Sequence, residues 1–144
     1  MRDTEKAIKN MIDKTKLTSI NSIDDLMFFD KMPQMLPLYE ALKGKLQVAY
    51  PNMKIKVTKT QISFRNRHVF AMASLPWKKV KGWPDKYLLV SFGLSYRIES
   101  PRIIQSVEAY PNRWTHHVIV EHEEEFDTEL MDWIDNAYQF SAIK

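Results

Sequence analysis

The sequence predicts an α+β fold, with one antiparallel sheet and helices at both ends of the chain. Apolar residues recur with the period of a helix over residues 4–49 and again from residue 126, whereas they alternate with polar residues between residues 54 and 121. The alternating segments follow one another through short turns, which is typical of antiparallel strands. A chain of 144 residues, 44% of them hydrophobic, fits one domain. We therefore expect four to five strands, covered by N-terminal helices and one C-terminal helix.

Three helices are expected before the first strand. A short helix over residues 4–16 has a narrow apolar stripe, which suits a peripheral position. Ser22–Asp25 has the pattern of a capping box and predicts the start of a second helix, which stops before Pro33. A third helix over residues 35–49 has apolar residues at i, i+3, i+4 and i+7 spacing, which predicts a core-facing stripe. That stripe consists of Met35, Leu38, Tyr39, Leu42, Leu46 and Ala49.

Five segments in the middle of the chain have the alternation of strands, with turn residues between them. The alternation slips at Lys59–Gln61, which predicts a turn or bulge, and Asn66–Arg67 is a hairpin-sized break. Pro76–Asp85 is expected to form a loop, and Ser100–Pro101 is expected to open a short helical turn. We place the strands over residues 54–58, 62–65, 69–75, 86–94 and 114–121.

A final helix is predicted after the last strand. Its apolar side chains fall on one stripe, and Asp127 is its expected N-cap. Together with the N-terminal helices, this helix is expected to cover one face of the sheet. The stripe consists of Phe126, Leu130, Trp133, Ile134, Ala137 and Tyr138.

The composition excludes several classes of protein. The chain has no cysteine, which excludes disulfide bonds, thiolate catalysis and zinc sites that use sulfur. It has three glycines and lacks the motifs that cradle phosphates, so we expect no nucleotide-dependent catalysis and no cofactor. No apolar run approaches the ~18–20 residues of a membrane span, and the N-terminus lacks the apolar segment of a signal peptide. We expect a soluble cytoplasmic protein without a membrane partner.

Charge is divided unevenly along the chain, although the formal net charge is only +3. Residues 41–84 contain ten basic residues and no acid, whereas residues 114–143 contain eight acids and no Lys or Arg. One interpretation is a basic surface that attracts phosphate, with aromatic rings nearby to stack on bases. The alternatives are that the basic residues only solvate an exposed strand face, or that they pair with the C-terminal acids within the chain or between subunits.

The histidines are not spaced as metal ligands, and no metal site is expected. His116 and His117 point to opposite faces of one strand, and His122 lies about 20 Å from His116 along it. His116 has apolar neighbours, which favours a core or sheet-edge position, with a general base as the alternative. Arg113 at the sheet rim would hold a carboxylate or phosphate, or pair with the C-terminal acids. Because no nucleophile with a recognisable setting accompanies them, an enzyme is the least favoured hypothesis.

Four motifs resemble those of a bacterial domain family of unknown function. They are Leu38-Tyr39-Glu40 with Leu42, T-K-T-x-I-x-F over residues 58–64, R-W-x-H over residues 113–116, and W-I-x-x-A-Y over residues 133–138. The resemblance covers about residues 35–140, so we divide the chain into an N-terminal helical extension, residues 1–33, and the family domain, residues 34–144. Some longer relatives are labelled "predicted transport protein". In them the domain looks like an appendage to other modules, which implies binding rather than catalysis.

These observations together predict a non-enzymatic binding module for an anionic partner, with nucleic acid as the favoured anion. The second hypothesis is a protein-interaction or homo-oligomerisation domain, in which the basic sheet of one subunit meets the acidic helix of another. The third is an enzyme that uses His116 and Arg113. The candidate binding residues are Lys54, Lys56, Lys59, Thr60, Arg65, Arg67, Lys78, Lys79, Arg113 and His116.

Overall fold

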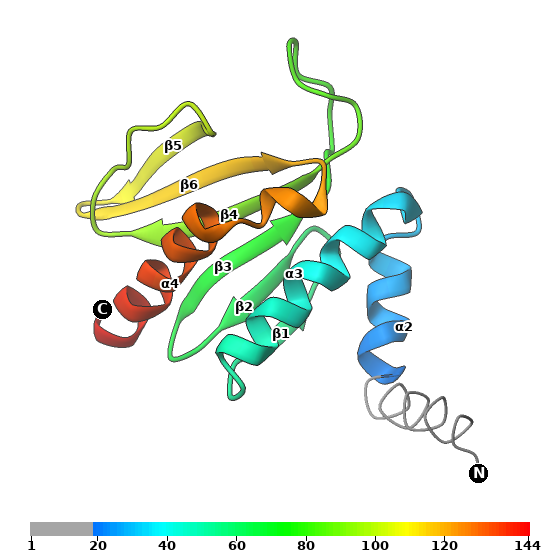
Figure 1. Cartoon of the computed structure of the whole chain (residues 1–144), viewed down its shortest axis with the longest axis horizontal. Coiled ribbons are helices and arrows are strands. Elements are labelled where there is room, and N and C mark those ends of the chain that lie inside the picture. Colours follow the sequence, from blue (N-terminus) through cyan, green and yellow to red (C-terminus); the bar gives the residue numbers. More distant parts are fainter. Residues whose placement is uncertain (1–18) are drawn as a thin grey trace.

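The computed structural model describes residues 19–144 and confirms an α+β fold with one antiparallel sheet (Figure 1). The helix expected over residues 4–16 lies outside the described residues. The helices are α2 (Ser19–Phe28), α3 (Leu36–Ala49) and α4 (Thr128–Ile143), with short 3-10 turns η2 (Pro33–Met35) and η3 (Glu123–Glu125). The strands are β1 (Lys54–Val57), β2 (Ile62–Arg65), β3 (Val69–Ser74), β4 (Leu88–Leu94), β5 (Ile103–Tyr110) and β6 (Arg113–Val120).

The sheet has six strands rather than four to five, because β5 was not predicted. Its spatial order is β1-β2-β3-β4-β6-β5. After β4 the chain crosses to the edge of the sheet to form β5, and β6 then lies between β4 and β5. The expected helical turn at Ser100–Pro101 is a simple turn that leads into β5. The register of β5 shifts between Ile103 and Gln105 and again between Glu108 and Tyr110. These irregularities break the two-residue alternation, which is the signal that identifies a strand in a sequence.

Helices α3 and α4 cover one face of the sheet, as expected (Figure 1). Tyr39 of α3 stacks on Phe64 of β2 with ring centroids 6.2 Å apart. Trp133 of α4 stacks on Phe92 of β4 at 5.9 Å, and α4 begins at the predicted cap, where the Asp127 side chain accepts a hydrogen bond from the backbone N–H of Leu130. The core therefore lies between this face and the two helices, and it includes the fully buried side chains of Ile62, Phe64, Val90, Phe92 and Val118.

The opposite face carries no helix from the part of the chain that the structure describes. We call it the open face. Of its central residues, Ser63 and Ser91 are buried and Met72 and His117 are half-buried, whereas its residues on β1 are exposed. Directly opposed residues of antiparallel strands share a face. The pairing register therefore places Lys56, Ser63, Met72, Ser91, His117 and Gln105 in one row across the open face, from β1 to β5.

Helix α2 is joined to the body of the molecule by a buried ion pair. It begins at Ser19 rather than near Ser22, so the expected capping box at Ser22–Asp25 lies inside the helix. The Asp25 carboxylate accepts a hydrogen bond from the Lys43 ammonium of α3 at 2.9 Å, and both side chains are almost fully buried. Phe28 and Phe29, which follow Asp25 closely in the sequence, are also buried. Met27 is 72% exposed. The division of the chain at residue 33 stays a prediction.

Candidate binding cleft

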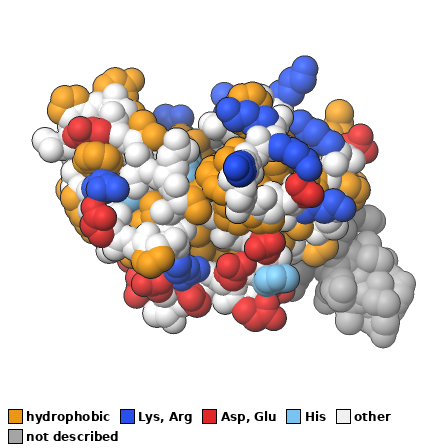
Figure 2. Space-filling view, turned by 90° about the horizontal axis from the view of Figure 1, so that it is seen from above, with side chains coloured by type: hydrophobic (Ala, Val, Ile, Leu, Met, Phe, Trp, Pro, Cys, Tyr) orange, Lys and Arg blue, Asp and Glu red, His pale blue; other side chains and the backbone are white. Residues whose placement is uncertain are grey.

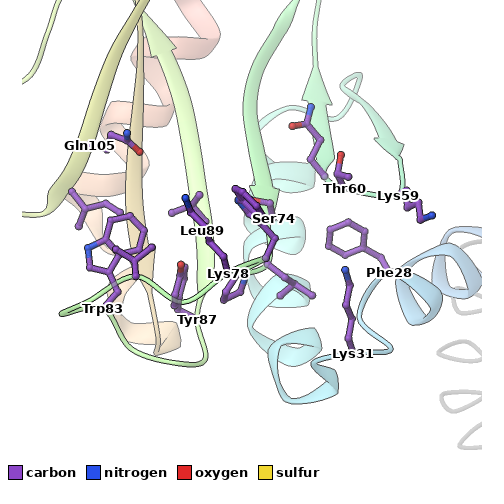
Figure 3. Close-up of a pocket in the computed structure, with 16 residues that line it drawn as sticks. Phe28, Lys31, Lys59, Thr60, Ser74, Lys78, Trp83, Tyr87, Leu89 and Gln105 are labelled. Atoms are coloured by element: carbon purple, nitrogen blue, oxygen red, sulfur yellow. The ribbon is translucent and has the colours of Figure 1, made fainter.

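A cleft of about 860 Å³ lies at the end of the sheet where the chain leaves β3 and returns into β4 (Figure 3). This volume is within the usual range of small-molecule sites. Four segments meet there: the end of α2, the β1–β2 turn, the β3–β4 loop and the start of β5. The lining residues are Phe28, Lys31, Lys59, Thr60, Gln61, Ser74, Leu75, Pro76, Trp77, Lys78, Val80, Trp83, Tyr87, Leu89, Ile104 and Gln105.

The β3–β4 loop supplies most of the aromatic surface of the cleft. Trp77 is 82% exposed, and the Lys78 ammonium lies 4.9 Å from the centroid of its ring. Trp83 packs edge-on against the buried Tyr87, with ring centroids 6.2 Å apart. Gly82 has a φ of 87°, a conformation that favours glycine, and the turn it forms is closed by the hydrogen bond from the Trp83 N–H to the Val80 carbonyl. The loop therefore presents two indole rings to the cleft. The ring of Trp77 is exposed, and the ring of Trp83 packs against Tyr87.

The β1–β2 turn positions Lys59 and Thr60 at the rim of the cleft. The Thr58 N–H and hydroxyl both donate to the Gln61 carbonyl at 2.9 Å, and the Gln61 N–H donates back to the Thr58 hydroxyl at 3.2 Å. This confirms the turn predicted at Lys59–Gln61. Because the turn is closed by Thr58 and Gln61, the side chains of Lys59 and Thr60 between them stay exposed. Figure 3 shows both near Phe28 and Lys31 of the α2 end.

The charge of the cleft is entirely positive. Lys31, Lys59 and Lys78 line it, and no carboxylate from residues 19–144 does. Figure 2 looks onto this end of the molecule: most of the Lys and Arg side chains in view gather on one side of a hollow, and many Asp and Glu side chains lie along the lower edge. A concave surface lined by one sign of charge concentrates ligands of the opposite sign.

Three further predicted residues lie on the open face and do not line the cleft. Lys54 and Lys56 project from β1 and are exposed, and Arg65 of β2 is the register partner of Lys54. Gln105, Ser74 and Leu89 line the cleft and also belong to the open face, so the cleft and this face are continuous.

Three other predicted residues do not line the cleft. Arg67 is exposed in the β2–β3 turn, and Lys79 forms an ion pair with Asp85 at 3.2 Å within the β3–β4 loop. Arg113 lines a separate hollow of about 350 Å³, where its guanidinium lies 5.0 Å from the ring centroid of Phe140. The predicted anion-binding set is therefore spread over at least three places.

His116 is fully buried under the helices and lies outside the cleft. Its Nε2 accepts a hydrogen bond from the Ile98 N–H at 2.9 Å, and its ring stacks on Phe92 at 5.1 Å. Burial lowers the pKa of this imidazole, so the neutral form is favoured. This position corrects the expectation that His116 contacts an anion, because a buried neutral ring cannot reach a partner at the surface.

His117 lies on the open face and forms a pair that the sequence did not reveal. Its Nδ1 is 2.7 Å from the hydroxyl oxygen of Ser91, its register partner on β4. Burial also lowers the pKa of His117, which favours the neutral ring at pH 7. Among residues 19–144 no acid is hydrogen-bonded to His117, so this pair lacks the third group that orients the base in a catalytic triad.

The basic residues are not neutralised by the acids near the C-terminus. Within the described ranges, the ten basic residues of 41–84 form two ion pairs, Lys43 with Asp25 and Lys79 with Asp85. The C-terminal acids pair instead with Arg102, which contacts Asp127 and Glu129 at 2.9 Å and donates to the Glu125 carbonyl. Pairing with the C-terminal acids therefore does not explain the basic segment.

Several cleft residues were not identified from the sequence. Phe28 and Lys31 belong to the segment assigned to an N-terminal extension, and Ile104 and Gln105 belong to the unpredicted β5. Trp83 gave a usable signal, because the ten-residue loop over residues 76–85 contains two tryptophans and three lysines. Residues from four separate segments converge here, and convergence of that kind is not encoded in local spacing.

No helix between residues 19 and 144 is long and apolar enough to cross a bilayer. In the same part of the chain, no three His, Asp or Glu side chains are grouped as they would be to hold a metal ion.

The described residues form an α+β fold with an aromatic, positively charged cleft at the end of a sheet face that no described helix covers. The chain belongs to the family described as "Domain of unknown function (DUF5655)", whose model matches residues 25–141. The match confirms the resemblance to a domain family of unknown function. The chain matches no curated protein and no solved structure.

Proposed function

We propose that this protein is a non-enzymatic binding module for an anionic partner, and that the partner is nucleic acid. The observation that carries this proposal is the lining of the cleft, which combines the rings of Trp77 and Trp83 with three lysines and no carboxylate. Indole rings stack on the faces of nucleobases, and lysines contact phosphates. Amide and hydroxyl groups from Gln61, Gln105 and Thr60 add hydrogen-bonding groups for base edges.

Two observations support binding over catalysis. His116 does not line the hollow in which Arg113 lies, so the two residues of the catalytic hypothesis do not converge. Trp77 has most of its surface exposed, and a large exposed ring flanked by a lysine is typical of a recognition surface rather than of a packed loop.

The affinity for a fluorescein-labelled 12-nucleotide single-stranded DNA or RNA of mixed sequence should fall steeply as salt rises. Three lysine–phosphate contacts give a slope of about −2 in a plot of log K against log salt, or about a 20-fold loss between ~50 and ~200 mM salt. Fluorescence anisotropy measures this directly. Absence of binding at ~50 mM salt, or an affinity that salt does not change, would contradict the proposal.

A further inference from the structure

The open face extends the cleft across the sheet. Ser74 and Leu89 line the cleft and are register partners on the open face. Two residues further along the same strands, Met72 and Ser91 are also partners and belong to the row that runs from Lys56 to Gln105. Gln105 lies both in that row and in the cleft. A ligand held in the cleft therefore has an uninterrupted path onto the row.

The chemistry of the row changes from its centre to its margin. Met72 is half-buried at the centre, beside the hydrogen-bonded pair of Ser91 and His117. The β1–β2 margin is basic, with Lys56 in the row and Lys54 and Arg65 on the adjoining positions. The row thus offers apolar and hydrogen-bonding groups in the middle and positive charge at the end far from β5.

The six described strands place no carboxylate on the open face. The six strands contain a single acid, Glu108, and its register partner Trp114 places it on the other face, since Trp114 is itself opposite the core residue Leu94. No described helix covers the open face. Because its charged residues on β1 and β2 are basic, a polyanion complements its charge. The cleft alone would accept a nucleotide-sized ligand, but the basic margin lies beyond it.

We propose that the ligand is a single-stranded nucleic acid, with one base in the cleft against Trp77 or Trp83 and the following nucleotides laid across the open face toward Lys56. This inference rests on the proposed function. Five inter-strand steps of about 4.8 Å give the row a length of about 24 Å. Single-strand binding domains of comparable size cover about 4–16 nucleotides.

Duplex DNA does not fit this arrangement. In a duplex the base faces are stacked on one another and only the base edges are accessible in the grooves, so neither tryptophan can stack on them. We therefore expect discrimination between single and double strands.

The test compares strand form and strand length in wild type and in two charge-reversal variants. Lys56→Glu changes the open face outside the cleft, and Lys45→Glu is its matched control, an exposed lysine of α3 with the same change in charge. Each protein is titrated at ~50 mM salt with a fluorescein-labelled trinucleotide, a 12-nucleotide single strand and the corresponding 12-base-pair duplex. Circular dichroism checks that the variants are folded.

We expect the single strand to bind at least about tenfold more tightly than the duplex, since the loss of one stacking contact accounts for that factor. Lys56→Glu should weaken the 12-nucleotide strand about tenfold and leave the trinucleotide unchanged, and Lys45→Glu should change neither by more than about twofold. Equal affinity for duplex and single strand, or equal losses for both strand lengths, would overturn the inference while the proposed function stands. If no strand binds to the wild type at all, the proposed function fails as well.

Discussion

The triple variant Lys31→Glu/Lys59→Glu/Lys78→Glu should lose about 1,000-fold in affinity for a 12-nucleotide single strand. Each of these lysines lines the cleft, where no carboxylate of the described residues compensates its charge. A charge-assisted contact contributes about 1.5–3 kcal/mol, and each 1.4 kcal/mol corresponds to a tenfold change, so three lost contacts give at least about 10³. Anisotropy titrations at ~50 mM salt measure the loss.

The control for this variant reverses three lysines that do not line the cleft. Lys45→Glu/Lys81→Glu/Lys86→Glu also moves the formal net charge from +3 to −3, and all three positions are exposed. It should therefore reproduce any effect of overall charge and leave the local contacts intact, with a loss of about tenfold or less. Similar losses in the two triple variants would show that binding depends on net charge and not on the cleft.

Lys43→Met should destabilise the protein by about 3–5 kcal/mol, because it leaves the buried carboxylate of Asp25 without its partner. The Lys43 ammonium is 2.9 Å from Asp25 Oδ2, and Asp25 is 1% exposed. The second oxygen, Oδ1, is also buried and accepts no hydrogen bond from the described residues, so the Lys43 ammonium is the partner on which the carboxylate depends in this part of the chain. Urea denaturation gives the free energy of unfolding.

The double variant Asp25→Leu/Lys43→Met is the control for this prediction. Removing both charges together avoids an unpaired buried ion, so its stability should be within about 1 kcal/mol of the wild type, or higher. Lys45→Met, at an exposed position of the same helix, should change stability by less than about 0.5 kcal/mol. A loss below about 1 kcal/mol for Lys43→Met would mean that the ion pair does not hold α2 to α3.

Elements with strong periodicity could be predicted from the sequence, and elements with irregular geometry could not. The stripe of α3 and the cap at Asp127 were predicted, because i, i+4 spacing and capping chemistry are local properties. Strand β5 was missed because two register shifts break its alternation. The start of α2 was misplaced because Asp25 is of a residue type that is common in capping boxes. In the structure its carboxylate accepts a hydrogen bond from Lys43, 18 residues away.

The candidate site was predicted only in part, for the same reason. The loop with Trp77 and Lys78 and the turn with Lys59 and Thr60 are recognisable from composition, and both line the cleft. Their convergence with Phe28 and β5 depends on the strand order, in which β6 lies between β4 and β5. Strand alternation separated His116 from His117, and the apolar neighbours of His116 favoured a core or sheet-edge position for it, which agrees with its burial in the structure.

The indole signals of the four tryptophans test the central claim most directly. Trp77 and Trp83 line the cleft, whereas Trp114 lines the separate hollow near Arg113 and Trp133 packs on Phe92 beneath α4. In a ¹⁵N-labelled sample titrated with a 12-nucleotide single strand, the side-chain N–H signals of Trp77 and Trp83 should shift or broaden while those of Trp114 and Trp133 stay in place. Unchanged signals from Trp77 and Trp83 at saturation, or shifts confined to Trp114 and Trp133, would contradict a nucleic-acid site in this cleft.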